Sequence, residues 1–167
     1  GNLRLIVLTH GDFDHTGGAA ALRQKFGAQI VMHPDDAGMA ETADMFWNRR
    51  KANWLVKKAV PALFGFGRRS RFSPDILAGE GFDLSSYGLD ARLLSLPGHS
   101  QGSIGLLTGS GDLFCGDLLM NEKGKLSLGY GAPAGFAASI ARVRTLPLRR
   151  IYPGHGQPFG PEELSRL

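Results

Sequence analysis

The sequence Leu8-Thr9-His10-Gly11-Asp12-Phe13-Asp14-His15-Thr16-Gly17-Gly18 is the stretch from which the fold is best deduced. It places two histidines and two aspartates within six positions, between the apolar residues 5–8 and the helix-forming residues 19–26. A strand that ends in clustered His and Asp and then turns on glycines is a suitable cradle for metal ions, because glycine lets the backbone turn sharply beside them. Small polar clusters also form ordinary turns, so the spacing alone leaves both interpretations open.

The composition is that of a globular protein. The 167 residues are 43% hydrophobic and 20% charged, and no apolar run approaches the roughly 18 residues that a membrane span needs. The net charge of +4 suits anionic substrates or nucleic acid, but it equally fits an ordinary solvated surface. The single cysteine, Cys115, excludes an internal disulfide and a cysteine-based zinc site. A single cysteine is typical of proteins in a reducing compartment, so we expect this protein to be located in the cytoplasm.

Both ends of the sequence resemble the interior of a fold. The chain opens almost directly on a strand-like run, without the pattern of a signal peptide. It closes on residues 161–167, whose composition is typical of the first turns of a helix. We therefore expect a fragment of a longer protein.

The order of the expected elements is typical of an α/β protein. Residues 19–26 are predicted to form a helix that Gly27 ends, and residues 28–32 a short buried strand. Further strands are expected at 81–84, 91–96 and 150–152, a hairpin with arms 103–108 and 112–115, and a helix at 136–146. His33 follows the strand 28–32, where it is either a ligand or the polar start of the next helix.

Residues 37–80 are predicted to form a helical and basic insertion. Residues 37–60 have helical composition with several Lys and Arg, and residues 64–72 interleave aromatics, glycines and arginines. One interpretation of the basic region 49–71 is a lid that contacts an anionic substrate, a nucleic-acid strand or a membrane surface. The other is a solvated pair of helices joined by a loop.

Four strands are expected to end on His or Asp flanked by glycine. These positions are the His10–His15 cluster, His99 in Pro97-Gly98-His99, Asp117 after Gly116, and His155 in Pro153-Gly154-His155-Gly156. Loops at one edge of a sheet converge in space, so we expect these side chains to share one cleft. His and carboxylate ligands without thiolate are typical of Zn, Fe or Mn sites.

At these residues the sequence resembles the metallo-β-lactamase-fold hydrolases. The resemblance is carried by Thr9-His10-Gly11-Asp12-Phe13-Asp14-His15, Pro97-Gly98-His99-Ser100, Gly116-Asp117 and Pro153-Gly154-His155-Gly156, in the order and separation of the family's metal motifs. It implies an α/β fold, a four-layer αββα sandwich that forms a single domain over residues 1–167, with a dinuclear metal site at one edge. The family's first strands precede the opening motif and are missing from this sequence, which supports the expectation of a fragment.

The resemblance also implies the ligand set for two divalent ions, with zinc expected first. One ion would be bound by His10, Asp12 and His99, the other by Asp14, His15 and His155, with Asp117 bridging both. Asp14 would in addition orient the nucleophile, which makes it the expected catalytic residue.

Asp12 departs from the usual motif, which has histidine at this position. A carboxylate makes the first site more negative and closer to the ligand sets that favour Fe or Mn. A related carboxylate occurs in the family's di-iron redox members, and the HxDxDH form occurs in hydrolases related to DNA-uptake proteins. The alternative is that Asp12 binds no ion.

The expected activity is hydrolysis by a hydroxide that bridges the two metals and attacks a carbonyl or phosphoryl centre. Residues 98–103 resemble the corresponding motif of the glyoxalase II type, so an ester, thioester or lactone is the first expected substrate. We expect a small-molecule substrate, with anionic character as one option. The alternatives are a phosphodiesterase or nuclease acting on nucleic acid, which we do not favour, a di-iron redox protein with a flavin-binding partner domain, and a non-catalytic binding protein.

Overall fold

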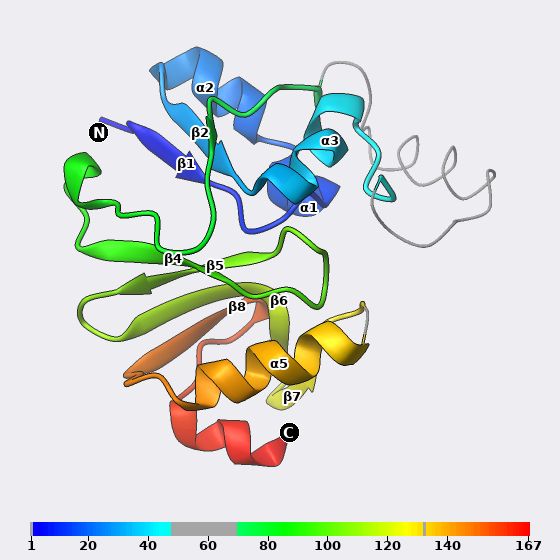
Figure 1. Ribbon diagram of the computed structural model, residues 1–167, viewed down its shortest axis with the longest axis vertical. Helices are drawn as coiled ribbons and strands as arrows, with labels where there is room; N and C mark the ends of the chain where they lie inside the picture. Colours follow the sequence, from blue (N-terminus) through cyan, green and yellow to red (C-terminus); the bar gives the residue numbers. More distant parts are fainter. Residues whose placement is uncertain (1, 48–69, 132) are drawn as a thin grey trace. The chain divides into compact units, whose positions relative to one another are not determined.

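The computed structural model describes residues 2–47, 70–131 and 133–167 (Figure 1). The chain divides into two compact units, residues 1–78 and 79–167, and each is described by itself. Strands and helices occur in both, which confirms the predicted α/β class. The single domain over residues 1–167 stays a prediction. Most of the predicted basic insertion, residues 48–69, lies outside the described residues.

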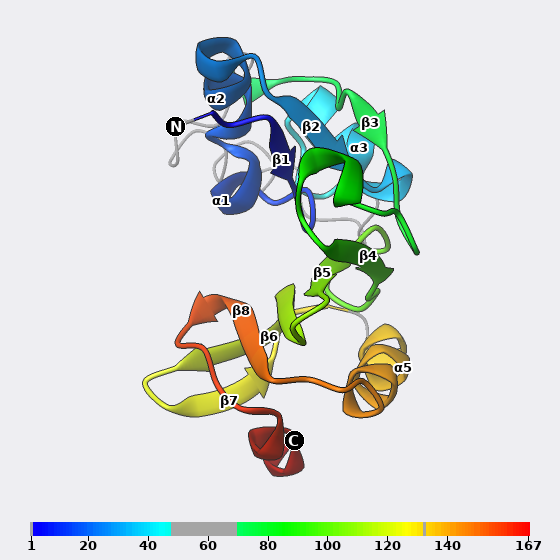
Figure 2. The same cartoon turned by 90° about the vertical axis from the view of Figure 1, so that its left-hand side faces the viewer.

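The first unit contains a three-stranded parallel sheet in the order β1-β2-β3 (Figure 2). Its elements are β1 (Leu5–Val7), α1 (Phe13–Thr16), α2 (Ala19–Phe26), β2 (Gln29–Met32), α3 (Pro34–Thr42) and β3 (Ile76–Leu77). Buried apolar side chains from β2 and the helices form its core, with Ile30, Met32 and Ala40 among them. Leu8, which begins the opening motif, and Ala19, which follows it, both belong to this core, so the chain is packed at both ends of the motif.

Helix α2 spans the predicted residues 19–26. It ends where Gly27 adopts a left-handed φ of 68° and donates its backbone N–H to the carbonyl of Arg23. Helix α3 begins earlier than expected, because the His33 side chain accepts a hydrogen bond from the Asp35 backbone N–H and caps it. His33 is therefore the polar start of a helix, as the second interpretation held.

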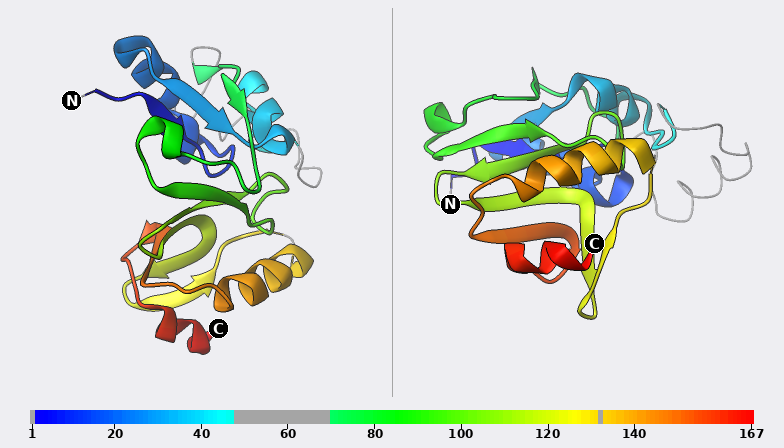
Figure 3. Two further views of the ribbon diagram at one scale, coloured as in Figure 1. Left: turned by 60° about the vertical axis from the view of Figure 1, so that its left-hand side comes forward. Right: turned by 60° about the horizontal axis from the view of Figure 1, so that its bottom comes forward.

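The second unit contains a five-stranded sheet in the order β4-β5-β6-β7, with β8 beside β6. Its elements are η2 (Ser85–Tyr87), β4 (Ala91–Ser95), β5 (Ile104–Thr108), β6 (Asp112–Glu122), β7 (Lys125–Leu128), α5 (Pro133–Arg144), β8 (Arg150–Gly156) and η3 (Pro161–Arg166). Helix α5 lies along one face of this sheet (Figure 3). Its Phe136, Ile140 and Val143 join the buried cluster that contains Leu113 and Ile151 of the strands.

The structure differs from expectation at residues 81–84. In place of a strand it has one isolated bridge between Asp83 and Arg92, followed by the short helix η2. The Asp83 carboxylate accepts hydrogen bonds from the backbone N–H (2.9 Å) and the hydroxyl (2.7 Å) of Ser85. The hydrogen bond from the Ser85 backbone is the main reason that the pKa of Asp83 lies below its ordinary value. Such local bonding turns the chain and competes with strand pairing.

The hairpin of residues 103–115 is confirmed, but its second arm is longer than expected. Strand β6 continues through Gly116 to Glu122, and its pairing with β8 shifts register on both sides of Gly116. Gly116 has a φ of 52°, a conformation that glycine adopts without strain. The irregularity bends the strand without ending it. In the described ranges, no helix is both long and apolar enough to cross a membrane.

Candidate metal centre

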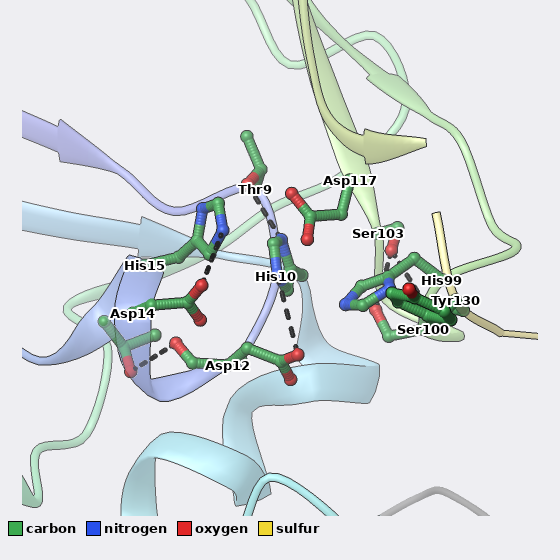
Figure 4. A network of polar contacts seen from close by, with 12 residues as sticks. Thr9, His10, Asp12, Asp14, His15, His99, Ser100, Ser103, Asp117 and Tyr130 are labelled. Atoms are coloured by element: carbon green, nitrogen blue, oxygen red, sulfur yellow. Dashed lines mark hydrogen bonds and ion pairs between the residues drawn. The ribbon is translucent and has the colours of Figure 1, made fainter. Parts of the chain in front are cut away.

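The opening motif gathers its two histidines and two aspartates within the first unit (Figure 4). The rings of His10 and His15 have their centroids 4.1 Å apart. His10 Nε2 lies 4.0 Å from Asp12 Oδ2, and His15 Nε2 lies 3.6 Å from Asp14 Oδ2. His10 and Asp12 are buried, whereas the Asp14 side chain is 39% exposed. One short segment thus presents two imidazoles and two carboxylates at close range.

Asp12 is the N-terminal cap of α1 through its backbone. Its carbonyl oxygen accepts hydrogen bonds from the backbone N–H groups of His15 (3.1 Å) and Thr16 (2.9 Å) and from the Thr16 hydroxyl (2.9 Å). Its carboxylate makes no capping bond to the helix. Because the backbone does the capping, the carboxylate remains directed toward His10.

A buried aspartate supports the motif from α3. Asp36 is 0% exposed, and its Oδ2 accepts a hydrogen bond from the Gly11 backbone N–H at 3.2 Å. A Cβ at residue 11 would stand 2.5 Å from the Cβ of Met39, so only glycine lets the loop approach α3 this closely. In the sequence, Asp36 looked like one acidic residue at the start of a helix. No motif there signals its contact with Gly11.

The second unit supplies the other three predicted side chains. His99 lies in the loop after β4, Asp117 in β6 and His155 in β8. His155 Nε2 lies 3.4 Å from Asp117 Oδ2, because β6 and β8 are neighbouring parallel strands. The sequence predicted that Asp117 and His155 follow the ends of strands. The structure corrects this, because β6 continues past Asp117 to Glu122 and His155 lies within β8, which ends at Gly156.

The His99 loop is closed by two serines. The Ser103 hydroxyl accepts a hydrogen bond from the Ser100 backbone N–H at 3.0 Å, and the two hydroxyls are 2.8 Å apart. The His99 ring is buried, and its Nδ1 lies 2.6 Å from the carbonyl oxygen of Tyr130. A carbonyl only accepts, so Nδ1 is the donor, and in the neutral imidazole Nε2 then carries the lone pair with which the ring binds a metal.

The donor atoms in each unit fit divalent metal ions of the Zn, Fe or Mn kind, because all are imidazole nitrogens or carboxylate oxygens. Cys115 does not join them. It belongs to the hydrophobic core, and burial raises the pKa of its thiol to about 12. Cys115 is therefore a packing residue of the second unit, and its thiol is a poor nucleophile at neutral pH.

Comparison with known proteins supports the family resemblance that the sequence motifs indicate. Residues 1–155 match the family model described as the metallo-beta-lactamase superfamily. The chain is 30% identical to the hydroxyacylglutathione hydrolase GloC of Haemophilus influenzae, over 93% of this chain and 69% of the relative. It is also 30% identical to the acyl-coenzyme A thioesterase MBLAC2 of Gallus gallus, over 98% of this chain and 60% of the relative. It covers only 48% of the hydroxyacylglutathione hydrolase of Anaeromyxobacter dehalogenans.

Solved structures also resemble nearly the whole chain, TTHA1623 and BLEG-1 among them. The protein TTHA1623, solved in a di-iron-bound form, superimposes with a TM-score of 0.75 at 28% identity, covering 97% of this chain and 74% of its own. The B3 metallo-beta-lactamase BLEG-1 superimposes with a TM-score of 0.73 at 26% identity, covering 98% of this chain and 75% of its own. These similarities confirm the fold family predicted from the sequence.

Proposed function

We propose that this chain, which belongs to the metallo-beta-lactamase superfamily, is the catalytic part of a metal-dependent hydrolase that cleaves thioesters, with esters and lactones as related substrates. The observation that carries the proposal is the chemistry of the family's motif positions. Each unit presents closely spaced imidazole and carboxylate groups there. Relatives that match over nine-tenths of the chain are named as a hydroxyacylglutathione hydrolase and an acyl-coenzyme A thioesterase, and both names denote thioester substrates.

We assign the ligands of two divalent ions as the family's motifs imply. The first ion would be bound by His10, Asp12 and His99, the second by Asp14, His15 and His155, and both by Asp117. When bound, such ions polarise a carbonyl and acidify water. Within the chain, the carboxylate of Asp14 is the exposed member of the opening motif and is therefore suited to hold and orient the attacking water. The Nδ1–H of His99, held by the Tyr130 carbonyl, keeps Nε2 as the nitrogen available to a metal.

The test of this function is a substrate panel. The metal-loaded protein should hydrolyse a hydroxyacyl thioester of glutathione or an acyl-coenzyme A at rates well above those for a lactone or bis-p-nitrophenyl phosphate. The same preparation after dialysis against a chelator serves as the control and should be inactive until a divalent metal is restored. Hydrolysis of the phosphodiester in preference to every thioester would instead assign a phosphodiesterase. Failure on the whole panel with both sites loaded would rule out the hydrolase proposal.

The metal identity depends on Asp12. We propose zinc as the simplest occupant, with iron as the alternative that the Asp12 carboxylate favours and that the di-iron-bound relative illustrates. Elemental analysis of purified wild type should give two metals per chain. Asp12→Ala should bind fewer, and Asp12→His should restore two while shifting the content toward zinc. Unchanged stoichiometry in Asp12→Ala would show that Asp12 is not a ligand.

The substrate is proposed to be a small molecule. Nucleic acid stays an unfavoured alternative, since the basic residues that suggested it lie mostly outside the described ranges. The cytoplasm, expected from the single cysteine, also stays a prediction.

A further inference from the structure

The segment 129–131, between β7 and α5, passes closely over the backbone beside two predicted ligands of the second unit. The Gly129 backbone N–H donates to the carbonyl of Leu118 at 3.3 Å, one residue beyond Asp117. A Cβ at residue 129 would overlap the Asp117 carbonyl oxygen. A Cβ at residue 131 would overlap the Gly98 carbonyl oxygen and stand 2.7 Å from His99 Cα. Glycine on both sides of Tyr130 is therefore what allows this approach.

Between these glycines, Tyr130 contacts His99 through its backbone. Its carbonyl oxygen lies 2.6 Å from His99 Nδ1, and Figure 4 shows this contact next to the two serines that close the His99 loop. The tyrosine as a whole is 84% exposed, so its side chain takes little part in the packing. The contact belongs to the main chain, and the identity of the side chain at residue 130 is secondary to it.

Helix α5 closes the other side of the same loop. The Ser139 hydroxyl donates to the Pro97 carbonyl at 2.7 Å, and a Cβ on Gly98 would stand 2.8 Å from the Phe136 ring. A Cβ on Gly135 would stand 2.9 Å from Gly98 Cα. The loop that bears His99 is thus packed closely between α5 and residues 129–131.

We propose that residues 129–131 are a positioning strap for His99. Through the Tyr130 carbonyl, the strap holds the imidazole as the Nδ1–H tautomer, fixes the direction of Nε2 before any ion binds, and thereby raises the affinity of the first metal site. Hydrogen bonds that orient a ligand in this way typically change metal affinity by about 10- to 100-fold. The consequence for metal affinity rests on the proposed function, in which His99 is a ligand. The prediction of the His99 tautomer does not depend on the proposed function.

The first measurement is the tautomer of His99 in the metal-free wild-type chain. Long-range proton–nitrogen spectra of protein labelled with ¹⁵N-histidine, recorded well above the ordinary histidine pKa of about 6.5, separate protonated from unprotonated ring nitrogens. We expect a protonated Nδ1 and an unprotonated Nε2 for His99. The opposite tautomer in the wild type would overturn the proposal. No substitution is needed, so poor folding of a variant does not leave the question unanswered.

The second measurement compares glycine variants. Gly131→Ala should move the strap, lose the Nδ1–H signature and weaken zinc binding by about 10- to 100-fold in a competition titration with a chromophoric chelator. Gly160→Ala is the matched control, because the three atoms nearest to its Cβ would all belong to the carboxylate of Glu162, at the end of the flexible side chain of an exposed residue. Tyr130→Ala, which keeps the carbonyl, should retain the tautomer and the zinc affinity.

The outcomes separate the two proposals. A wild-type tautomer and zinc affinity in folded Gly131→Ala would overturn the strap while leaving hydrolysis intact. The expected tautomer and affinity changes, in a protein that cleaves none of the thioesters, lactones or phosphodiesters tested, would support the strap and count against the proposed function alone.

Discussion

Asp117→Ala is expected to lower thioester hydrolysis by about a thousandfold or more. Asp117 is a buried carboxylate of β6 with Oδ2 3.4 Å from His155 Nε2, and it is the residue assigned to both ions. Metal polarisation supplies several kcal/mol of transition-state stabilisation, and each 1.4 kcal/mol or so corresponds to a factor of ten in rate. The measurement is kcat/KM on the preferred thioester, together with the metal content of each preparation.

Asp112→Asn is the matched control for this change. Asp112 lies at the start of the same strand, where its carboxylate pairs with the largely exposed Arg149. Asn keeps an oxygen that can accept a hydrogen bond from Arg149, whose side chain is 63% exposed, so this variant should fold, bind two metals and hydrolyse within about twofold of wild type. Full activity and two metals in Asp117→Ala would refute its role as a shared ligand. An equal loss in both variants would indicate damage to β6 and not to the metal centre.

The elements that could be predicted from the sequence are those with local signals. Helix α2 was predicted over its full length because an apolar, alanine-rich run stops at Gly27, whose left-handed φ of 68° ends the helix. The hairpin of β5 and β6 was predicted because a glycine-rich turn separates two apolar runs. The closeness of the His and Asp side chains of the opening motif could be expected because they lie within six consecutive positions, and their role as metal ligands stays a prediction.

What the sequence did not reveal depends on contacts between distant positions. Gly11 and Asp36 are 25 residues apart, and His99 and Tyr130 are 31 apart. In each pair one partner contributes a backbone group, which every residue has, so no residue type marks the contact. The bulge at Gly116 was missed for a related reason. A glycine beside a ligand-type residue looks the same whether the strand ends there or bends and continues to Glu122.

Asp36→Ala is expected to destabilise the protein by about 2–3 kcal/mol. The carboxylate is completely buried and accepts a hydrogen bond from the Gly11 backbone N–H, which the substitution would leave without this acceptor inside the protein. Removing one partner of such a buried bond costs about 1–3 kcal/mol, and bonds that involve a charged group lie toward the upper end. The measurement is equilibrium denaturation of the metal-free chain, because bound metal would add its own stabilisation of the native state.

Asp35→Ala separates this hydrogen bond from the general effect of an acidic residue at a helix start. Both aspartates lie in the first turn of α3, but the Asp35 side chain is 57% exposed. Loss of its favourable interaction with the helix dipole should cost less than about 1 kcal/mol. Asp36→Asn retains an oxygen acceptor and should recover part of the loss. Equal destabilisation by Asp35→Ala and Asp36→Ala would mean that the contact with Gly11 contributes nothing beyond helix-end charge. A larger effect of Asp36→Ala, with partial recovery in Asp36→Asn, would show that α3 holds the backbone between His10 and Asp12 in place, since Gly11 is the residue that joins them.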